Sequence, residues 1–252
     1  MYRIMSFNLL CAGKGERAWS KRVPKVVSII KEISPDSFGV QEAHWEWMTE
    51  LCRYLPEYAY VGVGRDDGKK EGEFSAVFYK KDKFTASDSG NFWISETPEK
   101  PSKSWDSACT RIATYAKLTD KETGKAYFHF NTHLDHVGRI AQINGAKMIQ
   151  EKAASFGGVP VVCTGDFNVF QDSDCYNTMV SGNMKDARKL APDSDECCTF
   201  HGFRPEEIHE RIDFVFVDEA TVKPVNFKVV NKLVDGDFYS DHHAVYADVE
   251  LI

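Results

Sequence analysis

Asp166 and Asn168 follow an apolar run, Val159–Cys163, and their side chains are suited to binding a cation or a phosphate. The run predicts a buried strand, and Gly165 relieves the sharp corner at its end. In α/β sheets, ligands collect beyond the carboxyl ends of strands, where side chains two residues apart can face one cavity. Aspartate offers anionic oxygens to a hard cation, and asparagine offers a carbonyl or an amide donor. A simple turn also favours Asp and Asn, so this segment alone leaves both interpretations open.

Other ionisable or amide side chains also stand at or near the ends of predicted strands. Together with Asp166 and Asn168 they occupy six segments, and the others are Asn8 (strand 2–8), Glu42 (37–42), His133 (126–133), Asp213 (211–217), and Asp241 with His242 (before 244–251). Asp213 lies within an apolar run, where a carboxylate is costly unless it is paired. The repetition favours one shared site over six unrelated turns.

The elements that must position these residues alternate along the chain. Apolar residues at helical spacing predict helices over 19–33, 45–55 and 137–156, and strands are also predicted over 58–63, 74–79 and within 84–118. This alternation predicts an α/β architecture in one domain, residues 1–252. The segment 172–209 is the least regular part of the chain, and we assign it no function.

Net charge, cysteine content and the length of apolar runs limit the possible binding partners and cellular location. The net charge of −7 disfavours a broad surface for nucleic acid, although a nuclease with a local basic rim is compatible with it. The seven cysteines form an odd set without a C-x-x-C pair, which indicates a reducing compartment, and we expect a cytoplasmic protein. No run approaches the ~20 apolar residues of a membrane helix, so we predict no membrane insertion. We predict no protein partner.

Two other kinds of site are disfavoured by spacing. His129 and His133 share one face of their strand while His136 lies beyond its end, and no cysteine completes a zinc set. Gly62 and Gly64 precede a strand and not a helix, so they do not form a dinucleotide-binding fingerprint.

Six short motifs, taken in order, resemble the endonuclease/exonuclease/phosphatase superfamily, which includes deoxyribonucleases, sugar phosphatases and deadenylases. They are Ser6-Phe7-Asn8, Gln41-Glu42, Thr132-His133-Leu134-Asp135, Gly165-Asp166-Phe167-Asn168, Arg211-Ile212-Asp213 and Ser240-Asp241-His242. Phe92–Glu96 and Ser104–Asp106 look like a bacterial branch that is more similar to deadenylases and sugar phosphatases than to apurinic endonucleases. The resemblance implies a deoxyribonuclease-I-like four-layer sandwich, in which two mixed β-sheets pack face to face with helices on both outer faces.

The resemblance also implies a Mg2+ or Mn2+ site, since hard oxygen ligands without thiolate favour these ions over zinc. Glu42 would be the principal ligand, with Asn8 and Asp241 nearby. Asp166 and Asn168 would hold the attacking water and a phosphoryl oxygen, or a second metal ion.

His242 is the predicted general base, and Asp213 would fix its tautomer and support the imidazolium. His133, oriented by Glu73, would donate a hydrogen bond to the phosphoryl oxygen or to the leaving group. Arg65 and Trp105 are further candidates for substrate binding, and Trp105 lies in a polar loop, 97–106, that could instead be plain scaffold.

The first expectation for function is therefore a metal-dependent phosphoesterase that acts on a small phosphorylated compound, such as a sugar phosphate or a nucleotide. The alternative is a nuclease, in which a local groove binds DNA or RNA and is lined by Arg65, Lys69, Lys70, Lys100 and Lys103. A third possibility is a catalytically silent binding module with the same fold, since fold alone does not fix function.

Overall fold

The structure, a computed structural model, describes residues 1–252. Its strands form two sheets, one of seven strands and one of six. The first sheet has the order β10 (Asp193–Ser194), β12 (Val222–Val229), β13 (Val245–Leu251), β1 (Tyr2–Asn8), β2 (Ser37–Gln41), β4 (Val77–Lys80) and β3 (Tyr58–Val61). The second has the order β5 (Phe84–Trp93), β6 (Ile112–Asp120), β7 (Ala126–His133), β8 (Val161–Asp166), β11 (Asp213–Asp218) and β9 (Met184–Asp186).

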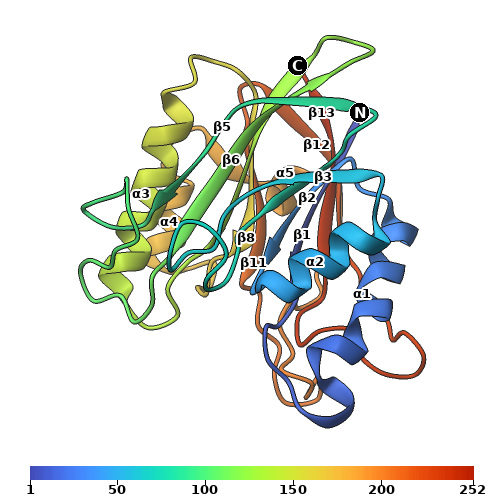
Figure 1. Ribbon diagram of the computed structural model, residues 1–252. Helices are drawn as coiled ribbons and strands as arrows, with labels where there is room; N and C mark the ends of the chain where they lie inside the picture. The colour runs from blue at the N-terminus through green and yellow to red at the C-terminus, as the bar shows by residue number, and fades with distance from the viewer.

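Four helices cover the outer faces of the two sheets, and the short α5 (Ala187–Leu190) packs between the sheets, against β12 and β11. The four are α1 (Trp19–Ile33), α2 (Trp45–Tyr54), α3 (Arg139–Ala154) and α4 (Asp174–Met179), and a short 3-10 helix lies at Gly15–Arg17. In Figure 1, α1 and α2 lie to the right of the sheets, and α3 and α4 lie to the left. None of the helices combines the length and the hydropathy that a membrane-spanning segment requires.

Three hydrophobic clusters fill the spaces between the four layers. One joins α1 and α2 to the first sheet, and it includes Val26 and Phe38. A second lies between the sheets, and the third joins α3 to the second sheet through Ile149 and Phe130. The predicted four-layer sandwich is therefore confirmed.

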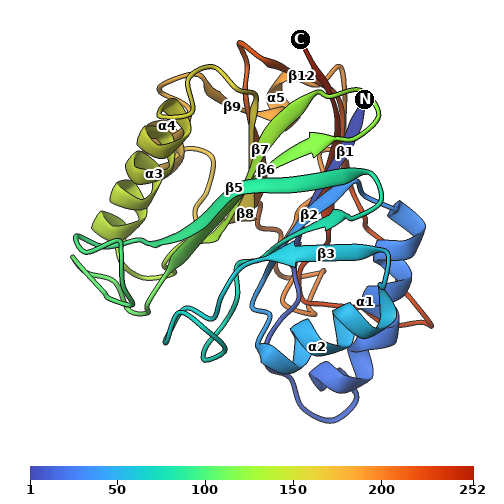
Figure 2. The ribbon, with the colours of Figure 1, turned by 45° about the horizontal axis from the view of Figure 1, so that its top comes forward.

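The central strands of the two sheets bring several strand ends to one edge of the molecule. β1 runs parallel to β2, with Asn8 beside Gln41, and β7 runs parallel to β8, with His133 beside Asp166. β11 runs antiparallel to β8, so its first residue, Asp213, lies opposite Asp166. Figure 2 shows β1 and β2 beside β7 and β8 at the centre of the sandwich.

The sheets approach each other very closely beneath this edge. Gly39 of β2 faces the second sheet, and a Cβ atom there would lie 2.1 Å from Oδ1 of Asn131 and 2.3 Å from Oγ1 of Thr164. Asn131 Oδ1 instead accepts hydrogen bonds from Gln41 Nε2 (2.6 Å) and from Thr164 Oγ1 (3.0 Å). This buried polar contact fixes β2 relative to β7 and β8.

Sequence patterns located several elements well and missed others. The strands 2–8 and 126–133 and the helix 19–33 match β1, β7 and α1, while α3 is shorter than the predicted helix over 137–156. The strand expected from residue 74 begins at Val77, because Phe74 forms isolated bridges to Ala43 and Gly64 instead. Short elements in the segment 172–209 and the strand β12 were not predicted.

Candidate active site

Asn8 links residues that are distant in the sequence. Its Nδ2 atom donates to Glu42 Oε1 at 3.1 Å and to Asp166 Oδ2 at 2.9 Å. Its Oδ1 atom accepts the main-chain N–H of Leu10 at 3.0 Å. Asn8 was predicted as an oxygen ligand, but here its nitrogen faces the carboxylates. Rotation of the amide by half a turn would exchange the two atoms.

Glu42 projects from the corner that follows β2. Its φ of 57° is left-handed, a conformation that non-glycine residues rarely adopt and that clusters at functional sites. Its Oε2 atom accepts the main-chain N–H of Cys11 at 3.0 Å. Burial alone would raise the pKa of Glu42, but nearby His133 and the Cys11 bond lower it to about 2. Glu42 therefore offers an ionised carboxylate.

His242 and Asp213 form a buried dyad. His242 Nδ1 donates to Asp213 Oδ2 at 2.9 Å, and both side chains are almost fully buried. Burial would lower the pKa of His242, but Asp213 together with Asp166 and Asp241 raises it to about 10. The strand register places Asp213 opposite Asp166 at the sheet edge.

Asp166 lies between two imidazoles. Its Oδ2 atom is 3.5 Å from His133 Nε2 and 3.8 Å from His242 Nε2. Burial, together with nearby Asp213, raises the pKa of Asp166. The two ring nitrogens therefore face one carboxylate oxygen, one from the end of β7 and the other from the loop before β13. The sequence predicts this convergence at strand ends.

Asn168 and Asp241 complete the rim of the site. Asn168 is left-handed, with φ of 52°, and its main-chain N–H donates to Asp166 Oδ1 at 2.9 Å. Beside Asp241, the Ser240 hydroxyl donates to the main-chain oxygen of Asn8 at 2.8 Å. Burial, and then nearby Glu42, raises the pKa of Asp241. Both residues therefore lie with the converged group.

The predicted orientation of His133 by Glu73 is only partly present. His133 Nδ1 is 3.6 Å from Glu73 Oε2, which is too long for a hydrogen bond. Arg65 Nη1 donates to the same carboxylate oxygen at 2.6 Å. Arg65 therefore binds Glu73 in this conformation.

Trp105 does not join the converged residues. It has φ of 58°, its side chain is 37% exposed, and it forms no hydrogen bond with any of them. Its loop is held instead by the next residue, Asp106, whose carboxylate accepts the N–H groups of Ile140 and Ala141 at the start of α3.

Several positioning residues were not predicted. Arg22 of α1 is buried and donates to main-chain oxygens of Leu9, Leu10, Ala12 and Tyr239, which joins the segments that follow Asn8 and precede Asp241. The sequence does contain a signal for Arg22, because it is a charged residue within the apolar stripe of a predicted helix.

Thr199 lies in the segment 172–209, to which we had assigned no function. Its Oγ1 atom accepts the main-chain N–H groups of Ile212 and Asp213, both at 3.1 Å, and its main-chain oxygen accepts from His243 N at 2.7 Å. This segment therefore positions both members of the His242–Asp213 dyad.

Two groups have side chains of the types that bind metals. In the first, single ligand atoms of Asp166, Asp213 and His242 lie within 4.8 Å of one another. Glu42 and Asp241 add carboxylates beside it. This is a set dominated by oxygen donors, which suits a hard cation.

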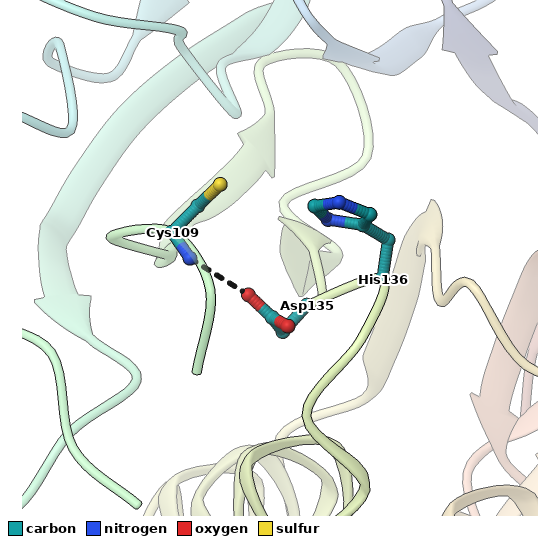
Figure 3. Close-up of side chains that lie close together, drawn as sticks. All are labelled: Cys109, Asp135 and His136. Carbon is teal, nitrogen blue, oxygen red and sulfur yellow. Dashed lines mark hydrogen bonds between the residues drawn. The ribbon is translucent and has the colours of Figure 1, made fainter. Parts of the chain in front are cut away.

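The second group, Cys109, Asp135 and His136, is not arranged as a metal site. Figure 3 shows the main-chain nitrogen of Cys109, not its sulfur, facing Asp135. Asp135 accepts N–H groups on both oxygens, including those of Cys109 and Gly138. His136 Nδ1 accepts a hydrogen bond from Arg111 Nη2 at 3.1 Å, which uses the lone pair that a metal ion would need.

Comparisons with known structures support this description of the fold. The endonuclease/exonuclease/phosphatase protein of Bacteroides vulgatus is 40% identical, with a TM-score of 0.95 over 100% of this chain and 99% of that one. The mannosyl-6-phosphatase of Bacteroides thetaiotaomicron is 33% identical, with a TM-score of 0.92 over 100% of both chains.

Matches by sequence lead to the same family. Two uncharacterized proteins of Acanthamoeba polyphaga mimivirus are 22% and 25% identical over 198 and 176 residues, and the alignments span 29% and 65% of their lengths. The sequence profile of the Endonuclease/Exonuclease/phosphatase family matches residues 5–242. The chain therefore belongs to the endonuclease/exonuclease/phosphatase family, whose members hydrolyse phosphate esters.

Proposed function

We propose that this protein is a Mg2+- or Mn2+-dependent phosphatase that hydrolyses phosphate monoesters of small molecules. The observation that carries the proposal is the placement of His242 and His133 around Asp166. The Nε2 atoms of the two imidazoles face the same carboxylate oxygen, and Asp213 holds the far side of the His242 ring.

The residues present fit a hard divalent cation. Three partly or fully buried carboxylates, Glu42, Asp166 and Asp241, gather with no lysine or arginine bound to them, and the neutral amide of Asn8 bridges two of them. Glu42, Asp241 and Asn8 would hold the ion. When bound, the ion would neutralise charge on the phosphoryl group.

The side chains of this protein carry out the remaining steps: proton transfer, positioning of the water and stabilisation of the leaving group. A cation bound beside Asp166 and Asp241 would offset the carboxylates that raise the pKa of His242, and so would favour its neutral form. In that form His242 accepts the proton of the attacking water at Nε2, while Asp213 holds the Nδ1 proton and stabilises the imidazolium. Asp166 and Asn168 position that water and a phosphoryl oxygen. His133 donates a hydrogen bond from Nε2 to the phosphoryl oxygen or to the leaving oxygen. The phosphorus–oxygen bond to the leaving group breaks as the bond to water forms.

Charge supports a small substrate over a nucleic acid. The net charge is −7, and several cations proposed for a nucleic-acid groove have partners within the protein. Arg65 binds Glu73, Lys103 donates to the main-chain oxygen of Ala108, and Lys70 lies over the ring of Trp45. The likeness to a mannosyl-6-phosphatase supports the same choice.

The test is a screen of phosphate release with Mg2+ or Mn2+ from sugar phosphates, nucleotides, inositol phosphates and short oligonucleotides. We expect release from small monoesters that changes little with added salt. Cleavage of oligonucleotides that weakens steeply with salt would favour the nuclease alternative instead. Failure to hydrolyse any ester, together with no metal binding by calorimetry, would favour a silent binding module.

We also propose a cytoplasmic location. All seven cysteines are free, as expected in a reducing compartment. Fractionation of the source cells tests this, and recovery outside the cytoplasmic fraction would contradict it.

A further inference from the structure

A cavity of about 600 Å³ adjoins the catalytic edge at Asn168. Two of its walls are continuations of the strands that carry the site, and residues of α3 and α4 complete its lining. Beyond His133, the end of β7 leads to His136, and beyond Asp166, the end of β8 leads to Asn168 and Phe170. Because β7 and β8 are neighbours with His133 beside Asp166, a molecule in the cavity can reach the catalytic edge.

Three charged side chains around the cavity have no partner inside the protein. The side chains of Arg139, Asp172 and Asp174 are exposed and form no hydrogen bond or ion pair with any other residue. They place one cation and two carboxylates around the same space. The Phe170 ring is 53% exposed, so an apolar surface is present beside them.

The hydrogen-bonding role of His136 is fixed by its neighbour. Arg111 is 4% exposed, and its Nη2 atom donates to His136 Nδ1 at 3.1 Å. A guanidinium can only donate, so Nδ1 must accept, and the ring proton must be on Nε2. The exposed His136 ring therefore presents an N–H donor, and Arg111 is a positioning residue for it.

We propose that this cavity binds a polyhydroxylated leaving group, the sugar part of a sugar phosphate, while the phosphoryl group occupies the catalytic edge. The proposal rests on the proposed phosphatase function. Hydroxyl groups both donate and accept, which matches donors on His136 and Arg139 combined with acceptors on Asp172 and Asp174. Phe170 is placed to cover an apolar C–H face of the ring. The two carboxylates repel a second anionic group, so a substrate with a single phosphate is favoured.

The test compares a hexose 6-phosphate with para-nitrophenyl phosphate, whose leaving group has no free hydroxyl group. In His136→Ala and Phe170→Ala, kcat/KM for the hexose phosphate should fall roughly threefold to tenfold through a higher KM, as expected for the loss of a hydrogen bond or packing contact. The kcat/KM of His136→Ala for para-nitrophenyl phosphate should stay within twofold of the wild type, because this leaving group has no hydroxyl group for the His136 N–H to bind. His136→Gln, which retains an N–H donor, should recover part of the loss.

Lys147→Ala is the matched control, because Lys147 is an exposed residue of α3 that lines a separate cavity of about 650 Å³. Inhibition by inorganic phosphate should be the same in all variants, because phosphate binds only at the catalytic edge. Equal losses with both substrates in His136→Ala, or no loss with either, would overturn the sugar subsite while leaving the phosphatase function intact. Absence of hydrolysis of any monoester by the wild type would overturn both proposals.

Discussion

Asn8 donates to two carboxylates, those of Glu42 and Asp166, that are 124 residues apart in the sequence (166 − 42). A neutral amide satisfies hydrogen-bond acceptors but leaves the negative charges uncompensated. The same region holds Asp241, whose nearest charged neighbours include Glu42. At the scale of single residues, this excess of negative charge is the strongest physical reason to expect a divalent cation.

The first prediction concerns Glu42→Gln. The change keeps the shape of the side chain and removes its charge, so Mg2+ affinity should fall by at least about tenfold, the lower limit observed even for residues that only support a metal ligand. Isothermal titration calorimetry of Mg2+ into both proteins measures it. Glu46→Gln, an exposed position on α2, is the control. Equal affinity in Glu42→Gln and the wild type would remove Glu42 from the metal site.

Residue types and their places at strand ends were sufficient to predict the ionisable members of the site. Asp213 is an example, because a carboxylate within an apolar run requires a partner, and His242 provides it. Arg22 and Thr199 could not be predicted in the same way. They bind main-chain groups of distant loops. A charge inside an apolar stripe singles out Arg22, but the sequence does not show which main-chain groups either residue binds.

At the scale of elements, the site depends on how closely the two sheets pack. Gly39 allows β2 to approach Asn131 and Thr164 of the second sheet. The residue after this strand's last position is Glu42, so a shift of β2 would move the proposed metal ligand away from Asp166.

We therefore predict that Gly39→Ala is destabilising by about 1–3 kcal/mol or more, because its Cβ would lie 2.1 Å from Asn131 Oδ1 in a closely packed interior. Urea unfolding measures the effect. Gly182→Ala is the matched control, since its Cβ would meet only the end of the flexible Gln150 side chain at 2.9 Å. Equal stability of the two variants would show that the sheets can separate there without cost.

Element prediction succeeded where the apolar pattern was long and regular. The α1 stripe and the alternating β1 strand have this character, and their bounds agree with prediction. The short strands β9 and β10, with three and two residues, carry too little pattern to be recognised. The polar residues around them suggested an irregular segment. These strands form by hydrogen bonding to β11 and β12, and the local sequence pattern does not show this pairing.

At the scale of the whole molecule, the site joins residues from position 8 to position 242, so metal binding and folding should be coupled. A ligand that binds only the folded state stabilises it by RT ln(1 + [L]/Kd). At a Mg2+ concentration ten times Kd, this amounts to about 1.4 kcal/mol, or a rise in Tm of roughly 3–6 °C for a protein of this size.

Differential scanning calorimetry with and without Mg2+ tests this prediction, with Glu42→Gln as the variant that should respond least. A Tm that is unchanged at saturating Mg2+ would contradict a metal site formed only by the folded chain.

The most direct measurement is the rate of phosphate release from a small monoester by the wild type and by His242→Ala, with Mg2+ or Mn2+ present and folding checked by circular dichroism. Because His242 Nε2 is the proposed acceptor of the water proton, removal of the imidazole should reduce turnover by at least ~10²-fold. A folded His242→Ala variant that hydrolyses the ester at nearly the wild-type rate would contradict the account.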